Sequence, residues 1–159
     1  MQITKTMALA FVAAFFSGHL LAETLQVHKT PTCGCCTKWI DHLEDNDYTV
    51  DAIDHDDLRD IKREHGVDPR LQSCHTAISK AGYVFEGHVP AGAISRFLAA
   101  PPEGAIGLSV PGMPVGSPGM EVGARFDPYY VVQMNKNAPP TAYIRVGNKA
   151  EQDALSADD

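Results

Sequence analysis

Hydrophobic positions in residues 24–98 change repeatedly between the spacing of a strand and the spacing of a helix. Helical spacing predicts three helices, the first over residues 35–46, the second ending at Gly66 and the third beginning at Pro90. Short apolar or alternating runs predict four strands, Leu25–His28, Tyr48–Ile53, His75–Ser79 and Tyr83–Phe85. The predicted order is strand, helix, strand, helix, strand, strand, helix.

This order predicts an α/β fold of the thioredoxin-like type, β-α-β-α-β-β-α. The first crossover implies a parallel strand pair, and Ala81-Gly82 predicts a hairpin that adds an antiparallel edge to the sheet. In such a fold the end of the first strand lies beside the start of the third. We therefore expect Cys74 and His75 to lie against the turn that follows the first strand.

After the third predicted helix the chain becomes rich in proline and glycine. Residues 101–125 contain five Pro and six Gly, which predicts a stiff, irregular loop rather than regular structure. The apolar run Pro128–Met134 predicts one added strand. Residues 137–159 are polar and end in acids, so we expect a disordered tail, with only the short segment Tyr143–Val146 left open. The predicted domain spans residues 23–136.

The first 22 residues have the features of a secretory signal peptide. Lys5 precedes an apolar run, Met7–Phe16, and small residues lead to a cleavage site near Ala22. The run is short for a membrane span, and no second hydrophobic segment follows it. The sequence therefore predicts an exported protein without a membrane anchor after cleavage. An uncleaved anchor is the alternative, because the n-region is weakly basic and Leu20 is not an ideal residue before the cleavage site.

The charge of the chain argues against nucleic acid as a partner. The formal net charge is −7, and no basic stripe is present, whereas nucleic-acid binding needs clustered Lys and Arg. An acidic surface is compatible with cations, metal ions included.

Three of the four cysteines lie within one turn, in the phrase Cys33-Gly34-Cys35-Cys36, and the fourth is Cys74. An even cysteine count in an exported protein is typical of two disulfides, but neighbouring cysteines pair poorly with each other. The turn stands between a strand and a helix N-terminus, where N–H groups and the helix dipole favour a thiolate. A thiolate acts either as a nucleophile or as a ligand for a soft metal.

The extra sulfurs favour metal binding over thiol exchange. Cys33 and Cys36 have the C-x-x-C spacing of thiol–disulfide exchange, but that chemistry has no use for Cys35 and Cys74. Thiolates and thioethers select Cu(I), whereas methionine is not a zinc ligand. Core packing remains an alternative role for the two methionines of the loop, Met113 and Met120.

The histidines differ in how strongly the sequence connects them to this site. His75 adjoins Cys74, and His88 precedes the third helix on a segment that could reach the same face. For His28, in the first strand, the sequence leaves open whether it reaches the site or packs elsewhere. The other histidines of helices and caps are expected to be solvated or hydrogen-bonded; they are His42, His55 and His65.

Four short motifs follow one another along the chain: Cys33-Gly34-Cys35-Cys36, Ser73-Cys74-His75-Thr76-Ala77, Glu86-Gly87-His88-Val89-Pro90, and the loop from Gly112-Met113-Pro114 to Gly119-Met120-Glu121. In this order they resemble the CopG-type copper-resistance proteins, over about residues 24–133. The resemblance implies a periplasmic, thioredoxin-like domain of Gram-negative bacteria that binds several copper ions and cycles between Cu(I) and Cu(II). It implies bridging cysteine ligands, Cys33, Cys35, Cys36 and Cys74, and supporting ligands, His75, His88, Met113 and Met120.

We interpret the sequence as a periplasmic copper-binding protein for copper resistance and metal homeostasis. Two alternatives stay open at this point. One is a thiol–disulfide oxidoreductase that uses Cys33 and Cys36. The other is a passive copper metallochaperone that passes copper to an efflux pump or to other periplasmic copper-handling proteins. The sequence does not decide whether the protein is also an enzyme that oxidises or reduces copper.

Overall fold

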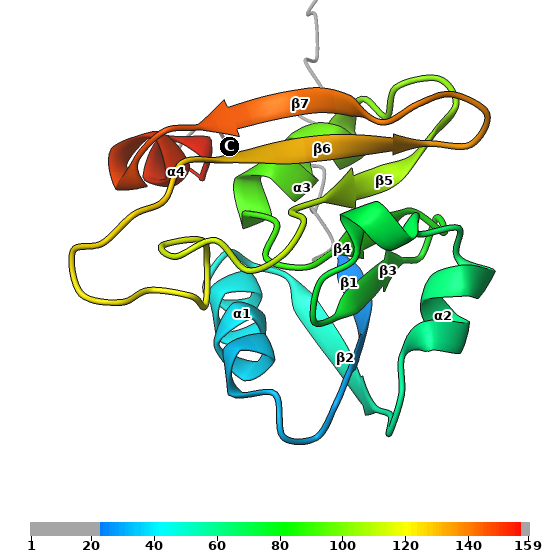
Figure 1. Ribbon diagram of the computed structural model, residues 1–159, viewed down its shortest axis with the longest axis horizontal. Helices are drawn as coiled ribbons and strands as arrows, with labels where there is room; N and C mark the ends of the chain where they lie inside the picture. Colours follow the sequence, from blue (N-terminus) through cyan, green and yellow to red (C-terminus); the bar gives the residue numbers. More distant parts are fainter. Residues whose placement is uncertain (1–22, 157–159) are drawn as a thin grey trace, which may run out of the picture.

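One mixed sheet of seven strands organises the chain, with helices on both of its faces (Figure 1). The structure is a computed structural model and describes residues 23–156. The predicted signal peptide lies outside the described residues. Within residues 23–156, no helix has both the length and the apolar character that a membrane crossing requires.

The first seven elements follow the predicted order, which confirms the α/β class. A short 3-10 helix, Pro69–Leu71, is inserted before the third strand. The elements are β1 (Thr24–Lys29), α1 (Gly34–Glu44), β2 (Thr49–Asp54), α2 (Arg59–Glu64), β3 (Thr76–Ser79), β4 (Val84–Glu86) and α3 (Ala91–Ala99).

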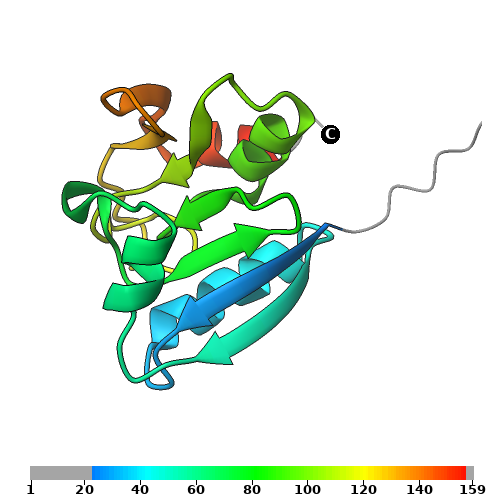
Figure 2. The ribbon, with the colours of Figure 1, turned by 90° about the vertical axis from the view of Figure 1, so that its right-hand side faces the viewer.

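Strand β1 lies between β2 and β3, and Figure 2 shows α1 packed behind these strands. β1 runs parallel to β2 and antiparallel to β3, with His28 opposite Thr76. The end of β1 therefore meets the start of β3, as the sequence predicts. α1 and α2 cover opposite faces of this part of the sheet (Figure 1).

The main hydrophobic core lies between the sheet and the inner faces of α1 and α3. The expected inward positions of α1, Cys36, Ile40 and Leu43, are all buried. Trp39 is also fully buried, and its indole N–H donates to the Val89 carbonyl oxygen at 2.8 Å. This core fixes the helix whose first turn carries the cysteines.

The prediction that residues 101–125 lack regular structure is wrong for one segment. Ala105–Ser109 forms β5, which pairs in parallel with β4, so β4 is not an edge of the sheet. A Cβ at Gly107 would lie 1.8 Å from the Val84 carbonyl oxygen. The glycine that counted against a strand is therefore what lets β5 approach β4 so closely.

The predicted disordered tail is also wrong, because most of it is folded. The predicted strand near 128–134 is β6 (Tyr129–Asn135), and β7 (Thr141–Val146) pairs with it antiparallel. Helix α4 (Lys149–Leu155) then packs on α3, where a Cβ at Gly92 would meet the Leu155 carbonyl oxygen. β7, at the edge of the sheet, and α4 bury only part of their surfaces, so many of their residues are polar. This polar composition led to the wrong prediction of disorder.

Candidate metal centre

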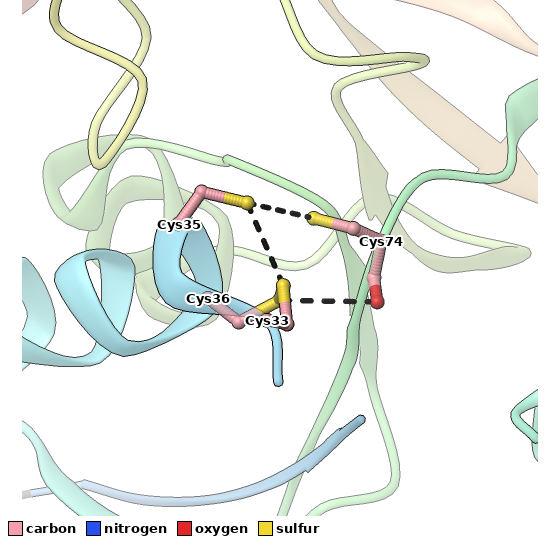
Figure 3. Close-up of side chains that lie close together, drawn as sticks. All are labelled: Cys33, Cys35, Cys36 and Cys74. Carbon is pink, nitrogen blue, oxygen red and sulfur yellow. Dashed lines mark hydrogen bonds between the residues drawn. A yellow bond between two sulfur atoms is a disulfide. The ribbon is translucent and has the colours of Figure 1, made fainter. Parts of the chain in front are cut away.

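The four cysteine sulfurs lie together at the N-terminus of α1 (Figure 3). All four are within 4.8 Å of one another. Cys33 and Cys36 form a disulfide in this structure, and Cys35 and Cys74 are free thiols. The Cys35 Sγ atom lies 3.5 Å from that of Cys33 and 3.9 Å from that of Cys74. The structure thus confirms that Cys74 meets the cysteine turn.

Local structure explains why these sulfurs converge. Cys33 is the N-cap residue of α1, and Cys36 faces the core from the first turn. Cys74 stands immediately before His75 and β3, next to the end of β1. Because β1 leads directly into the cysteine turn, the β1–β3 pairing brings the two segments together. One disulfide is present within residues 23–156, so the two-disulfide pattern that the sequence disfavoured is not found.

Two imidazoles contact the sulfur of Cys74. His75 Nδ1 lies 3.3 Å from Cys74 Sγ, and His88 Nε2 lies 3.1 Å from it. His88 Nδ1 donates a hydrogen bond to the Pro118 carbonyl oxygen at 2.8 Å. Since a carbonyl only accepts, the proton of a neutral His88 ring is on Nδ1, and the lone pair of Nε2 points toward Cys74.

Burial keeps these groups uncharged in the metal-free protein. Burial, and secondly the neighbouring Cys35 thiol, raise the pKa of Cys74 to about 12. Burial also lowers the pKa of His88, and lowers that of His75 well below its usual value. At neutral pH Cys74 is therefore a thiol, which must lose its proton to bind metal, whereas both imidazoles are neutral and already in the form that binds metal.

The methionine loop covers this site through its backbone. Pro118 accepts the His88 hydrogen bond, and a Cβ at Gly119 would lie 2.8 Å from the Cys35 carbonyl oxygen. Met120 follows this contact directly and is half-buried, whereas Met113 is 52% exposed. Ligation by either thioether stays a prediction.

The donor set suits a soft metal ion. Thiolate sulfur and neutral imidazole nitrogen are ligands that copper accepts, and they converge here from three separate segments. His75 Nε2 is buried without a hydrogen-bond partner. The four cysteines form one group of possible metal donors. A second group consists of Cys74, His75 and His88 and therefore shares Cys74 with the first.

Two solved structures resemble this chain over most of its length. Both are titled copper resistance protein CopG, in forms 2 and 1, and each is 38% identical to this chain with a TM-score of 0.75. They match 79% and 80% of this chain, and 99% and 100% of their own length. The chain belongs to the CopG family.

A family model for a protein family of unknown function, DUF411, also matches residues 71–120 of this CopG family member. The matched region contains Cys74, His75, His88 and both methionines of the loop, but not the cysteine turn. A comparison with curated proteins found no match.

Next to the candidate metal centre of this CopG family member lies a buried ion pair that sequence reasoning missed. Lys62 Nζ, on α2, lies 2.5 Å from Glu86 Oε1 and 3.0 Å from Thr76 Oγ1. The same carboxylate oxygen accepts the Ser73 N–H at 2.6 Å, directly before Cys74. Glu86 belongs to the quoted motif Glu86-Gly87-His88, but a lysine on a short polar helix gives no signal of burial.

The other histidines of residues 23–156 lie outside the two groups of metal donors. His42 Nε2 accepts the Ala91 N–H at 3.0 Å, as expected for a hydrogen-bonded residue. His28 Nδ1 lies 2.8 Å from His55 Nε2. His28 therefore does not join the cysteines, which settles the choice that the sequence left open.

Proposed function

We propose that this protein is a periplasmic copper-binding protein for copper resistance, and that it holds several Cu(I) ions in a cysteine-bridged cluster. The observation that carries the proposal is the convergence of four sulfurs within 4.8 Å, with two neutral imidazoles against Cys74. The names of the solved CopG structures support copper as the metal. The apolar run of residues 7–16 supports export.

The chain's own residues define how copper would be taken up. Two electrons and two protons from a dithiol reductant convert the Cys33–Cys36 disulfide into two thiols, while the reductant becomes a disulfide. Each thiol that binds Cu(I) then releases its proton to solvent. Imidazole is a ligand for both Cu(I) and Cu(II), so His75 and His88 would support interconversion of the two states.

Anaerobic titration with Cu(I) against a competing chelator tests the proposal. The fully reduced protein is expected to bind two or more Cu(I) ions tightly, because four thiols are then available. The protein with the Cys33–Cys36 disulfide intact is expected to bind fewer ions, since only Cys35 and Cys74 remain. Fewer than two tight ions in the reduced protein would contradict a cluster.

Copper binding is expected to strengthen as the pH rises. The raised pKa of Cys74 keeps its proton bound at neutral pH, so Cu(I) must displace that proton. Each proton released increases the apparent affinity about tenfold per pH unit. Titrations between pH 6 and pH 8 in two buffers of different ionisation enthalpy measure the number released. A pH-independent affinity would mean that Cys74 is not a ligand.

Met120→Leu is expected to weaken Cu(I) binding, and Met113→Leu should have a similar effect. Both substitutions remove a thioether but keep a similar apolar volume. Met134→Leu is the matched control, since Met134 is buried in β6 and belongs to a separate hydrophobic cluster. Competition titrations compare the three variants. Equal Cu(I) affinities in all three would assign the two loop methionines to packing.

A second candidate function is thiol–disulfide exchange, which the Cys33–Cys36 disulfide favours. This activity requires turnover of a disulfide substrate by metal-free protein, with Cys35 dispensable. A disulfide-reduction assay on wild type and the Cys35→Ser variant separates the two functions. Turnover retained by Cys35→Ser would support exchange, whereas absence of turnover in both would exclude it.

A further inference from the structure

A histidine of β1 and a histidine that follows β2 lie in direct contact on the face of the sheet opposite to α1. His28, on β1, is 6% exposed, and its Nδ1 atom lies 2.8 Å from Nε2 of His55, which follows β2. The two ring centroids are 5.0 Å apart. His55 is half-buried, so the pair can be reached from solvent on its side.

A glutamine fixes which nitrogen of His28 carries the proton. His28 Nε2 lies 3.1 Å from Gln26 Oε1, an oxygen that only accepts hydrogen bonds. The neutral ring therefore carries its proton on Nε2, and the lone pair of Nδ1 faces His55. A histidine whose second nitrogen is held by an oxygen acceptor has the arrangement found in metal-ligating histidines.

This histidine pair is separate from the cysteine centre. His28 is opposite Thr76 in the β1–β3 ladder, and directly opposed residues share one face of a sheet. Thr76 Oγ1 accepts a hydrogen bond from Lys62 of α2, so this is the face that α2 covers. The cysteine turn begins α1, which covers the opposite face (Figure 1).

The charges around the pair permit a cation. Burial lowers the pKa of His28, as do His55 and His65, while Asp51 and Glu64 raise it. Both carboxylates attract a positive ion, and His65 is a further imidazole close enough to act on His28. Two ligands of one metal, each ~2.0–2.1 Å from it, are about 3 Å apart, close to the present separation of the two nitrogens.

We propose that His28 and His55, with His28 held by Gln26, form a second metal site that takes a divalent imidazole-binding ion such as Cu(II) without any thiolate ligand. On binding, each of the two facing nitrogens offers a lone pair to the ion. The proton of the neutral His55 ring moves from Nε2 to Nδ1 by exchange with solvent, so both rings stay neutral and no net proton is released. The proposal does not depend on the cysteine cluster. An experiment that disproves metal binding at one of the two sites leaves the proposal for the other site unchanged.

Electron paramagnetic resonance of Cu(II) tests the site in the full chain with all four cysteines replaced by serine. One Cu(II) with nitrogen hyperfine splitting is expected, and His28→Gln and His55→Gln should each weaken its binding at least tenfold. Gln26→Leu should weaken binding ~10–100-fold, whereas Gln26→Glu retains an acceptor and should not. His42→Gln is the control histidine, because it contacts Ala91 and not this pair.

A second experiment keeps all four cysteines, so it tests metal binding at His28 and His55 even if the variant with four serines does not fold. Wild type first receives Cu(I) anaerobically to saturation and is then titrated calorimetrically with Ni(II), which does not oxidise Cu(I). One Ni(II) per chain is expected, and it should be lost in His28→Gln and His55→Gln but retained in His42→Gln. Absence of Ni(II) binding, or Ni(II) binding that survives both substitutions, overturns the proposal.

Discussion

Replacing Cys74 with serine is expected to lower the number of Cu(I) ions bound by the reduced protein by about one per chain or more. Cys74 Sγ is the atom that joins the two groups of donors, since it contacts both imidazoles and lies 3.9 Å from Cys35 Sγ. A hydroxyl oxygen is a hard, protonated donor and does not replace a soft thiolate. Anaerobic Cu(I) titration with a chelator measures the change.

The controls for this substitution must show that the protein loses copper binding while it stays folded. Ser79 is the last residue of β3, the strand that follows Cys74, and lies away from the cysteines, so the Cu(I) stoichiometry of Ser79→Ala should equal that of wild type. The thermal unfolding of metal-free Cys74→Ser should stay close to that of wild type, because Ser and Cys are similar in size. An unchanged Cu(I) stoichiometry in Cys74→Ser would remove this residue from the site.

Replacing Lys62 with methionine is expected to cost about 3–5 kcal/mol in the free energy of unfolding, which is typical when a buried ion pair loses one partner. Glu86 is fully buried, and without Lys62 its carboxylate lacks a counter-charge. Burial already raises the pKa of Glu86, and Lys62 opposes that rise. In Lys62→Met the carboxyl group should therefore take up a proton at a higher pH than in wild type. Urea unfolding measures the loss.

Loss of this pair should also weaken Cu(I) binding, since Glu86 holds the Ser73 N–H next to Cys74. Lys149→Met is the matched control, because Lys149 pairs with Asp153 on the exposed face of α4. An exposed pair of this spacing contributes only about 0.3–0.5 kcal/mol. The double variant Lys62→Met/Glu86→Leu should recover most of the stability. If Lys62→Met unfolded like Lys149→Met, the buried pair would have no structural role.

The regular part of the fold was predictable from residues 24–98 because the apolar spacing there is strong. Helix α4 was missed, although Asn148 followed three residues later by Glu151 is a capping-box pattern, and the Asn148 side chain accepts the Glu151 N–H. Gln152 is buried on this helix, where its Oε1 atom accepts a hydrogen bond from the Tyr129 hydroxyl. Composition alone cannot show that a polar residue has a buried partner 23 residues away.

The sequence by itself determined the cysteine turn at the start of α1 and its meeting with Cys74. Both follow from short-range periodicity and from the rules that govern strand connections. Only the tertiary structure decided which ring nitrogen of each histidine carries the proton and which nitrogen has a lone pair available for a metal. The Pro118 carbonyl holds the proton of His88 on Nδ1, Lys62 finds its buried partner Glu86, and His28 meets His55. Each of these contacts joins residues far apart in the chain, and hydrogen bonding and burial, which fix their protonation, exist only once the chain is folded.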